Sequence, residues 1–294
     1  MFDKLLFPTD GSDGAAAVFD HVLDVAEAHD ATVHVLSVAD TTRESVTQFR
    51  GQVVDALEQA GVRTVQEAAG RASDRGVPTV TEVMQGEPYR TIVDYANTYD
   101  IDLVIMPTHG RRGLDRFLLG STTERVVRRS DVPVLTIRPD DDVTVRYPYR
   151  NVLVPTDGSD PADAALNIGI DVANTASAAL HLVSVVNVTS LGVDVRTDIQ
   201  TAALEENAEG ILDAAAGRAR EAGIAPAATA VEFGGSVSRT VRTYVTDHDI
   251  DLVILGTHGR TGFDRYVLGS VTEQLVRTAP VPVLTVRGAP DSQS

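Results

Sequence analysis

Residues 249–287 read DIDLVILGTHGRTGFDRYVLGSVTEQLVRTAPVPVLTVR, and the organisation of the whole chain can be worked out from them. The stretch opens with a short apolar run at 252–255, the length of a fully buried strand. A loop with Gly256 and Gly259 follows, then an amphipathic segment that starts at Ser270 and ends at Pro280, then a β-branched run at 281–286. The pattern predicts a strand, a glycine loop, a helix and a second strand.

The glycine loop and the start of the helix form a candidate phosphate site. Glycine lets a backbone approach a ligand closely because it has no side chain. Ser270 directly follows Gly269 and can cap a helix, whose free N–H groups and positive dipole end suit a phosphate. The alternative is a purely structural role for Gly256, Gly259 and Gly269 in tight turns.

The same stretch occurs a second time, at residues 100–138. Aligned without a gap, 26 of the 39 positions are identical. The openings also match, since LFPTDGSD at 6–13 recurs as LVPTDGSD at 153–160. A copy of this length is a whole domain, because solenoid repeats run to only about 20–50 residues. We predict domains at 1–139 and 150–288, a charged linker at 140–149 and a tail at 289–294.

Each half alternates strand-like and helix-like segments. In the first half we expect strands at 4–8, 32–38, 78–84 and around 103, and helices at 13–29, 43–75, 88–99 and from 121, with breaks in the long helix at Gly51, Gly61 and Gly70. The second half repeats this order, with strands at 151–155, 178–186 and up to 233, and helices at 161–174, 197–222 and 236–248. The alternation predicts the α/β class, with a doubly wound parallel sheet in each half.

This fold class predicts where a ligand binds. In open parallel sheets, ligands bind outside the carboxyl ends of the strands, where the strand order reverses. The loops at 8–13 and 107–121 both follow strands, so we expect them to meet at that edge. Position and glycine content therefore predict the same site.

Composition excludes several classes of function. The chain has no cysteine, so disulfides and cysteine nucleophiles are ruled out. No run reaches the roughly 18 apolar residues of a membrane span, and Met1 leads directly into a strand rather than a signal peptide, so we expect a soluble cytoplasmic protein. The net charge of −17 repels nucleic-acid phosphates, so we expect no nucleic-acid partner.

The charge also has an unusual composition, with 29 Asp, 13 Glu, 24 Arg and a single Lys. An excess of aspartate with almost no lysine resembles proteins of salt-accumulating halophiles, where concentrated salt screens the self-repulsion. The alternative is an arginine bias from genome composition combined with an ordinary acidic surface.

Two motifs together resemble the universal stress protein family in its tandem, two-domain form. They are Pro-Thr-Asp-Gly-Ser after the first strand and Gly-x-x-Gly-x9-Gly-Ser after the fourth, and the resemblance covers nearly the whole chain. It implies two five-stranded sheets of order 3-2-1-4-5, of the adenine-nucleotide alpha-hydrolase-like (HUP) type. In one branch of the family it implies bound ATP or another adenine nucleotide with Mg²⁺ or Mn²⁺. It also implies pairing of residues 132–138 with 281–287, which would make the chain a pseudo-dimer.

The resemblance implies a role for individual residues of the second half. Pro155 and Asp157 would line the adenosine, Val185 would pack by the adenine, and the glycine loop and helix start would hold the phosphates. The chemistry agrees, because a carboxylate suits hydroxyls while Arg260 and backbone amides suit anions. Asp157 stiffening its own turn and Arg260 as a solvated charge are the alternatives. The predicted cofactor-binding residues are Pro155, Thr156, Asp157, Val185, Gly256, Thr257, His258, Gly259, Arg260, Gly262, Gly269, Ser270, Val271 and Thr272, and in the first half Pro8, Asp10, Val38, Gly110, Gly120 and Ser121.

One substitution predicts that the two halves are unequal. Pro107 stands where the second half has Gly256. Proline lacks the N–H and adds a ring, so we expect one tightly bound nucleotide per chain, in the second half, and in the first a weakened site or a pocket for another ligand. The alternative is that Pro107 lies harmlessly beside a working site.

Three function classes remain open. The leading one is a nucleotide-binding regulatory or stress-response protein without fast turnover, because no Walker lysine, catalytic dyad or cysteine nucleophile is present. The second is a slow ATPase or autokinase that modifies Ser270 or Ser121. The third is an interaction module that binds no nucleotide. We assign no catalytic residue and no metal ligand. Further homo-dimerisation of the chain is left open.

Overall fold

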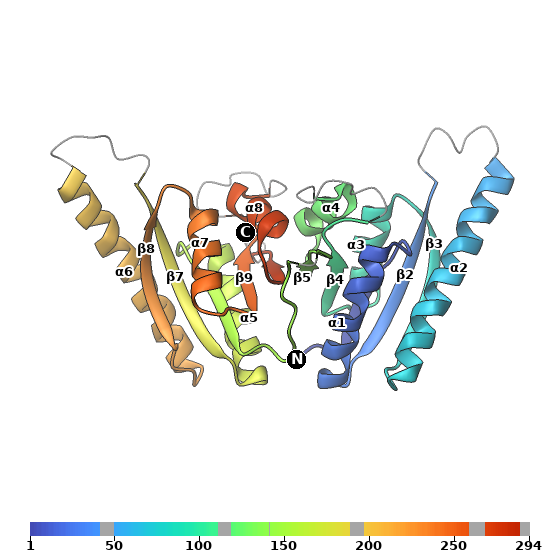
Figure 1. Cartoon of the computed structure of the whole chain (residues 1–294), viewed down its shortest axis with the longest axis horizontal. Helices are drawn as coiled ribbons and strands as arrows, with labels where there is room; N and C mark the ends of the chain where they lie inside the picture. Colours follow the sequence, from blue (N-terminus) through green and yellow to red (C-terminus); the bar gives the residue numbers. More distant parts are fainter. Residues whose placement is uncertain (42–49, 111–118, 141, 189–196, 259–267, 289–294) are drawn as a thin grey trace, which may run out of the picture. The chain divides into compact units, whose positions relative to one another are not determined.

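A computed structural model of the chain describes residues 1–41, 50–110, 119–140, 142–188, 197–258 and 268–288 (Figure 1). The chain divides into two compact units, Met1–Val143 and Thr144–Ser294. We refer to them as the first and the second domain.

The first domain holds a parallel five-stranded sheet with the order β3-β2-β1-β4-β5. Buried apolar runs form its central strands, and right-handed connections place α1 and α2 on one face and α3 and α4 on the other. Its elements are β1 (Lys4–Pro8), α1 (Asp13–His29), β2 (Thr32–Asp40), α2 (Arg50–Asp74), β3 (Thr79–Gly86), α3 (Pro88–Thr98), β4 (Leu103–Pro107), α4 (Ser121–Arg129) and β5 (Val134–Ile137).

The second domain repeats this architecture, with the order β8-β7-β6-β9-β10 and parallel neighbours throughout. The predicted fold class and strand order are therefore confirmed. Its elements are β6 (Asn151–Pro155), α5 (Asp160–Ala176), β7 (Ala179–Asn187), α6 (Thr197–Glu221), β8 (Ala228–Gly234), α7 (Val237–Asp247), β9 (Leu252–Gly256), α8 (Ser270–Thr278) and β10 (Val283–Val286).

The predicted breaks in the long helix of the first domain are wrong, because α2 runs without interruption from Arg50 to Asp74. Gly61 has a packing role instead. A β-carbon on Gly61 would lie 2.9 Å from Cγ1 of Val83 and 3.1 Å from the hydroxyl of Ser37. The glycine thus lets α2 lie close against β2 and β3 (Figure 1). The predicted start of this helix, at 43, lies outside the described residues.

A buried aspartate joins the start of the fourth strand to the start of the first strand in each domain. Asp251 is 2% exposed, and its Oδ2 accepts hydrogen bonds from the backbone N–H groups of Arg150 and Asn151, at 2.8 and 3.1 Å. Asp102 accepts equivalent bonds from Asp3 and Lys4, at 2.8 and 2.9 Å. These carboxylates satisfy strand-end amides that the sheet ladder leaves without a partner.

His21 is a buried titratable group on the inner face of α1. It is 3% exposed, and burial lowers its pKa from 6.5 to about 4, against the opposing effect of Asp24. Since the unfolded chain takes up this proton near pH 6.5 and the folded chain only near pH 4, the contribution of His21 to stability is present above pH 6.5 and is lost as the pH falls towards 4.

We expect His21→Ile to remove this part of the acid sensitivity. Isoleucine is a matched replacement, because Ile168 holds the equivalent place in α5. At about 1.4 kcal/mol per pH unit, the wild type should lose up to about 3 kcal/mol more than the variant between pH 7 and pH 4. Urea unfolding at both pH values measures the difference. Burial also lowers the pKa of His34 and His181. Both residues are present in the wild type and the variant, so their contributions to the pH dependence cancel in the comparison. Equal losses in the two proteins would contradict this assignment.

Candidate functional site

The turn after the first strand of each domain is held by its own aspartate. Asp157 Oδ1 accepts hydrogen bonds from the backbone N–H of Ser159, at 3.1 Å, and from its hydroxyl, at 2.6 Å. Asp10 Oδ1 accepts from the N–H of Ser12 at 3.0 Å. The turn-stiffening role that we gave as the alternative for Asp157 is therefore present. It fixes a half-buried carboxylate at the carboxyl edge of the sheet.

The glycine loop of the second domain is closed at its base by two hydrogen bonds. The N–H of Gly269 donates to the carbonyl of Thr257 at 2.8 Å, and the Thr272 hydroxyl donates to the carbonyl of Gly256 at 2.8 Å. The first domain repeats both bonds, from Gly120 to Thr108 and from Thr123 to Pro107. The helix start is thus fastened to the end of the preceding strand. The hydroxyl of Thr272, predicted as a ligand contact, serves this fastening.

The prediction that Ser270 caps the helix is wrong by one position. Gly269 is the N-cap residue of α8, and Ser270 is the first helical residue. Gly120 and Ser121 repeat this arrangement at α4. Since a glycine cap offers no side-chain acceptor, the first-turn N–H groups receive no capping hydrogen bond. A helix start of this kind is better suited to an external anion than one capped by serine.

The two loops of the first domain meet, as predicted. A β-carbon on Gly110 would collide with Oδ2 of Asp10, so only glycine allows the second loop to approach this carboxylate. Thr9, which precedes Asp10, donates its N–H to Leu36 at 2.9 Å and so ties the first turn to β2. The predicted residues Gly259, Arg260 and Gly262 lie outside the described residues.

Val185, for which an adenine contact was predicted, and Val38 of the first domain hold equivalent places in the two sheets. Each is half-buried among buried neighbours near the carboxyl end of its strand, β7 or β2. In the second domain, Thr156 donates its N–H to Val183 at 2.8 Å, two residues before Val185. The valine side chain therefore stands just beyond the point where the Asp157 turn leaves the sheet. Pro155 ends β6 beside this turn and is also half-buried.

The two domains differ at the end of the fourth strand, where the first has Pro107 and the second has Gly256. At the start of the first helix of each domain, the proline and the glycine are the other way round. A β-carbon on Gly256 would lie 2.7 Å from the backbone carbonyl carbon of Pro161, and one on Gly288 would lie 3.3 Å from its ring. The first domain has Gly14 where the second has Pro161. In the first domain, the atoms nearest to a β-carbon on Gly14 would be those of the Pro139 ring and the carbonyl oxygen of His109, so a small residue at 14 makes room for these segments.

A further proline and glycine differ between the domains just after the fifth strand. Pro139 replaces Gly288, and its ring lies 3.1 Å from where a β-carbon on Gly14 would stand. That Pro107 impairs a nucleotide site in the first domain stays a prediction, and the missing N–H of proline remains one reason for it.

The histidines of the two loops are held by their neighbours. Thr257 Oγ1 lies 3.1 Å from Nδ1 of His258, and Thr108 Oγ1 lies 3.2 Å from Nδ1 of His109. Within the described ranges, no group of three or more His, Asp and Glu side chains is placed to hold a metal ion.

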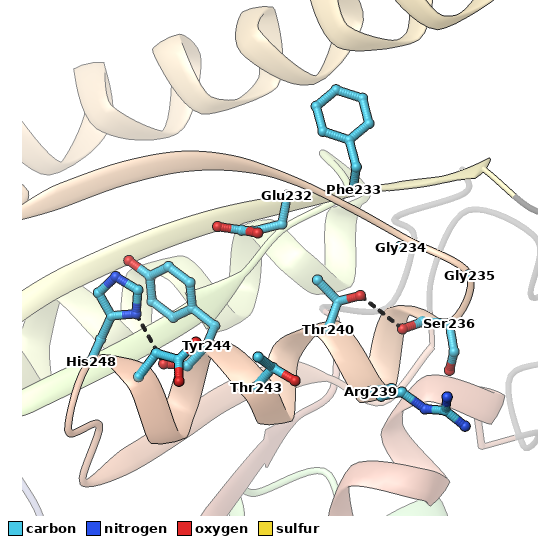
Figure 2. Close-up of a pocket in the computed structure, with 11 residues that line it drawn as sticks. Glu232, Phe233, Gly234, Gly235, Ser236, Arg239, Thr240, Thr243, Tyr244 and His248 are labelled. Atoms are coloured by element: carbon cyan, nitrogen blue, oxygen red, sulfur yellow. Dashed lines mark hydrogen bonds between the residues drawn. The ribbon is translucent and has the colours of Figure 1, made fainter. Parts of the chain in front are cut away.

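Sequence reasoning missed a cavity of 420 Å³ in the second domain (Figure 2). It lies between the end of β8 and one face of α7 and shares no residue with the predicted nucleotide site. A signal was available in the sequence. Two glycines, Gly234 and Gly235, join β8 to α7, where the first domain has only Gly86.

The family model described as "Universal stress protein family" matches this chain twice, at residues 1–138 and 148–287. The chain belongs to the universal stress protein family. A universal stress protein of Methanocaldococcus jannaschii is 32% identical over 141 residues, which are 47% of this chain and 83% of that protein. One of Mycobacterium bovis is 30% identical over 230 residues, 77% of this chain and 74% of that protein, which accords with a tandem form.

The crystal structure of a universal stress protein from Archaeoglobus fulgidus has a TM-score of 0.71 to this chain at 23% identity. The likeness covers 97% of this chain and 98% of the other, and it shows the shared fold. No helix in the described part of this universal stress protein is long and apolar enough to cross a membrane.

Proposed function

We propose that this universal stress protein binds an adenine nucleotide, ATP, and acts as a cytoplasmic regulatory or stress-response protein without fast turnover. One observation carries the proposal. The glycine-capped start of α8 is fastened to the end of β9 at the carboxyl edge of the sheet, the edge at which the Asp157 turn also lies. A helix start without a side-chain cap and a fixed carboxylate at one sheet edge match the two ends of a nucleotide.

Each part of the site takes the part of the ligand that its charge favours. The first-turn N–H groups of α8 would bind phosphate oxygens, and the Asp157 carboxylate would accept hydrogen bonds from ribose hydroxyls. Val185 would contact the adenine ring. A Mg²⁺ or Mn²⁺ ion would be held mainly by the phosphates. The approach of Gly110 to Asp10 gives the first domain the same narrow loop contact.

The position of the single lysine argues against fast phosphoryl transfer. Lys4 lies at the amino end of β1, and its Nζ donates to the carbonyl of Tyr99 at 2.9 Å. The chain has no other lysine that could reach a γ-phosphate as in a P-loop enzyme. The site therefore favours holding a nucleotide over turning it over.

The experiment is to denature the purified protein and identify released nucleotide by chromatography. We expect about one adenine nucleotide per chain, still present as ATP after hours of incubation. Decay of the ATP to ADP would favour a slow ATPase or autokinase. If no nucleotide is released and none binds on titration, the non-nucleotide interaction module is the correct class.

A charge placed at the helix start tests the site. Ser270 is exposed in the first turn of α8, where aspartate is favourable for the helix but repels phosphate. We expect Ser270→Asp to lose the copurified nucleotide, to keep the wild-type circular dichroism spectrum, and to melt at the temperature of the nucleotide-free protein. Ser121→Asp in α4 is the matched control and should retain it. Equal retention in both variants would show that α8 does not hold the phosphates.

We propose in addition that the chain is adapted to concentrated salt. With a net charge of −17, lowering KCl from about 2 M to about 0.05 M lengthens the distance over which charges repel. We expect the melting temperature to fall by several degrees over this range. A melting temperature that does not change would remove the halophilic interpretation. Pairing of the two domains and further homo-dimerisation stay predictions.

A further inference from the structure

The 420 Å³ cavity of the second domain is a groove between a strand and a helix (Figure 2). Its walls are the last residues of β8 and one face of α7, on which lining residues recur at helical spacing. It is lined by Glu232, Phe233, Gly234, Gly235, Ser236, Arg239, Thr240, Thr243, Tyr244, Asp247 and His248. Its volume is in the range of ligand-binding clefts.

One wall of the groove is an edge strand. Among the strands that the structure describes, β8 pairs only with β7 and has no partner on its other side. Ala227 donates its N–H to Leu180 at 2.8 Å. Because alternate residues of a parallel strand bond to the same neighbour, the N–H groups of Ala228, Ala230 and Glu232 point away from β7. They are available for a further strand.

The other wall is held rigid by aromatic contacts. The rings of Tyr244 and His248 stack at 3.8 Å with an angle of 12° between their planes. The Tyr244 hydroxyl lies 3.1 Å from Nδ1 of His181, which is buried on β7. Tyr244 is itself only 3% exposed. A peptide that entered the groove would therefore meet a surface that is already ordered.

The charges of the groove are arranged along its length. Arg239 is the only arginine or lysine among its lining residues, and it lies beside the Gly234–Gly235 turn, near the start of α7. The groove also holds two carboxylates, Glu232 on β8 and Asp247 on α7. Asp247 lies eight positions further along α7, about 12 Å away. This separation equals the length of about four extended residues. A strand parallel to β8 would end at Arg239 and pass Asp247 about four residues earlier.

We propose that this groove binds the extended carboxyl-terminal segment of a partner protein, which adds to β8 as a parallel strand. The terminal carboxylate pairs with Arg239, and a basic side chain about four residues before it pairs with Asp247. The main-chain groups of the segment bond to the outward groups of β8, in the manner of peptide recognition by strand addition. This function is separate from nucleotide binding.

The test starts from a random heptapeptide library displayed with free carboxyl termini, selected on the full-length protein. We expect enrichment of sequences with Lys or Arg near the fourth position from the end. A synthetic enriched peptide should lose at least tenfold in affinity when its terminus is amidated. Arg239→Gln should weaken the free-acid peptide to the same level and leave the amidated one unchanged. If no sequence is enriched, or if amidation has no effect, the proposal is wrong.

Two variants test strand addition itself. Ala230→Pro removes an outward N–H that the ladder with β7 does not use, so it should abolish peptide binding while β8 stays paired. Glu82→Pro is the matched control at the equivalent position of β3 and should bind normally. Thr243→Trp fills the groove from the exposed face of α7 and should also abolish peptide binding. It replaces Ala230→Pro as the test if that variant has a lowered melting temperature.

Hydrogen exchange distinguishes strand addition from side-chain contact alone. With the enriched peptide bound, exchange should slow at the amides of Ala228, Ala230 and Glu232 and should not change at Thr229. Equal binding by the wild type and Thr243→Trp, or unchanged exchange at these three amides, would overturn the proposal.

Discussion

Replacing Gly256 by proline is expected to destabilise the second domain by about 3 kcal/mol, the upper range for forcing extra volume into a packed site. The added ring would meet the backbone of Pro161, which already lies 2.7 Å from the position of a β-carbon on Gly256. Neither partner can move easily, because one ends a buried strand and the other lies in the first turn of α5. Thermal unfolding followed by circular dichroism and calorimetry measures the loss.

A second substitution at residue 161 should restore stability to the Gly256→Pro variant. Adding Pro161→Gly recreates the pair Pro107 and Gly14 of the first domain. It removes the β-carbon of residue 161 and frees its backbone to shift away from the new ring, so the double variant should recover part of the lost stability. If the double variant is no more stable than the single one, the two positions do not compensate each other. Pro161→Gly alone is the control, and it should cost less than Gly256→Pro because it adds no atom.

The double variant also separates the two effects of proline on the nucleotide site. Its fold is expected to be intact while residue 256 lacks an N–H. If this N–H contributes to binding, the double variant should release less nucleotide on denaturation than the wild type, and Pro107→Gly should give the first domain a second bound nucleotide. Unchanged stoichiometry in both would show that Pro107 is harmless and that the two domains bind alike.

Asp251→Ala is expected to cost the second domain about 2–4 kcal/mol. The change leaves the part-buried N–H groups of Arg150 and Asn151 without their acceptor, and an unsatisfied group costs about 1–3 kcal/mol when it is buried and less when water can reach it. Arg146, whose Nη1 lies 3.8 Å from Oδ1 of Asp251, is 64% exposed and contributes little. Urea unfolding measures the change.

Two further variants give the comparison for Asp251. Asp251→Asn keeps an acceptor oxygen and should lose less. Asp102→Ala removes the equivalent carboxylate of the first domain, where the amide of Asp3 is exposed to water, and should also lose less. A loss at Asp102 equal to or above that at Asp251 would contradict the role given to burial.

The fold could be predicted from the sequence because its signals are local and occur twice. Apolar runs such as 252–255 and the helix starts at Ser12 and Pro88 can each be recognised from a few neighbouring residues. The duplication then supplies a second copy of each segment. The meeting of the loops at Asp10 and Gly110 followed from the fold class alone. The exact cap residue did not, because Gly269 and Ser270 are both acceptable caps by type, and only backbone angles separate them.

The remaining features depend on residues far apart in the chain. The sequence predicted that Gly256 makes room for a ligand. In the structure its neighbour is Pro161, and no local sequence pattern connects these two residues. Gly61 was read as a helix break because its reason, the side chain of Val83, lies on another element. The groove beside α7 was missed because its walls come from two elements, and the pair Gly234 and Gly235 marks a turn between them without showing that a groove lies beside it.

The proline exchange has a consequence for how the gene can change. Its two halves encode long matching stretches, which is the condition for unequal recombination between them. A crossover between the codons for the first helix and the fourth strand would join Pro161 to Pro107 in one product and Gly14 to Gly256 in the other. In the first product the proline at the end of the fourth strand would face Pro161, which already lies close to the backbone there. We therefore expect this chimaera to be less stable than either present domain, which would disfavour such a merger of the two copies.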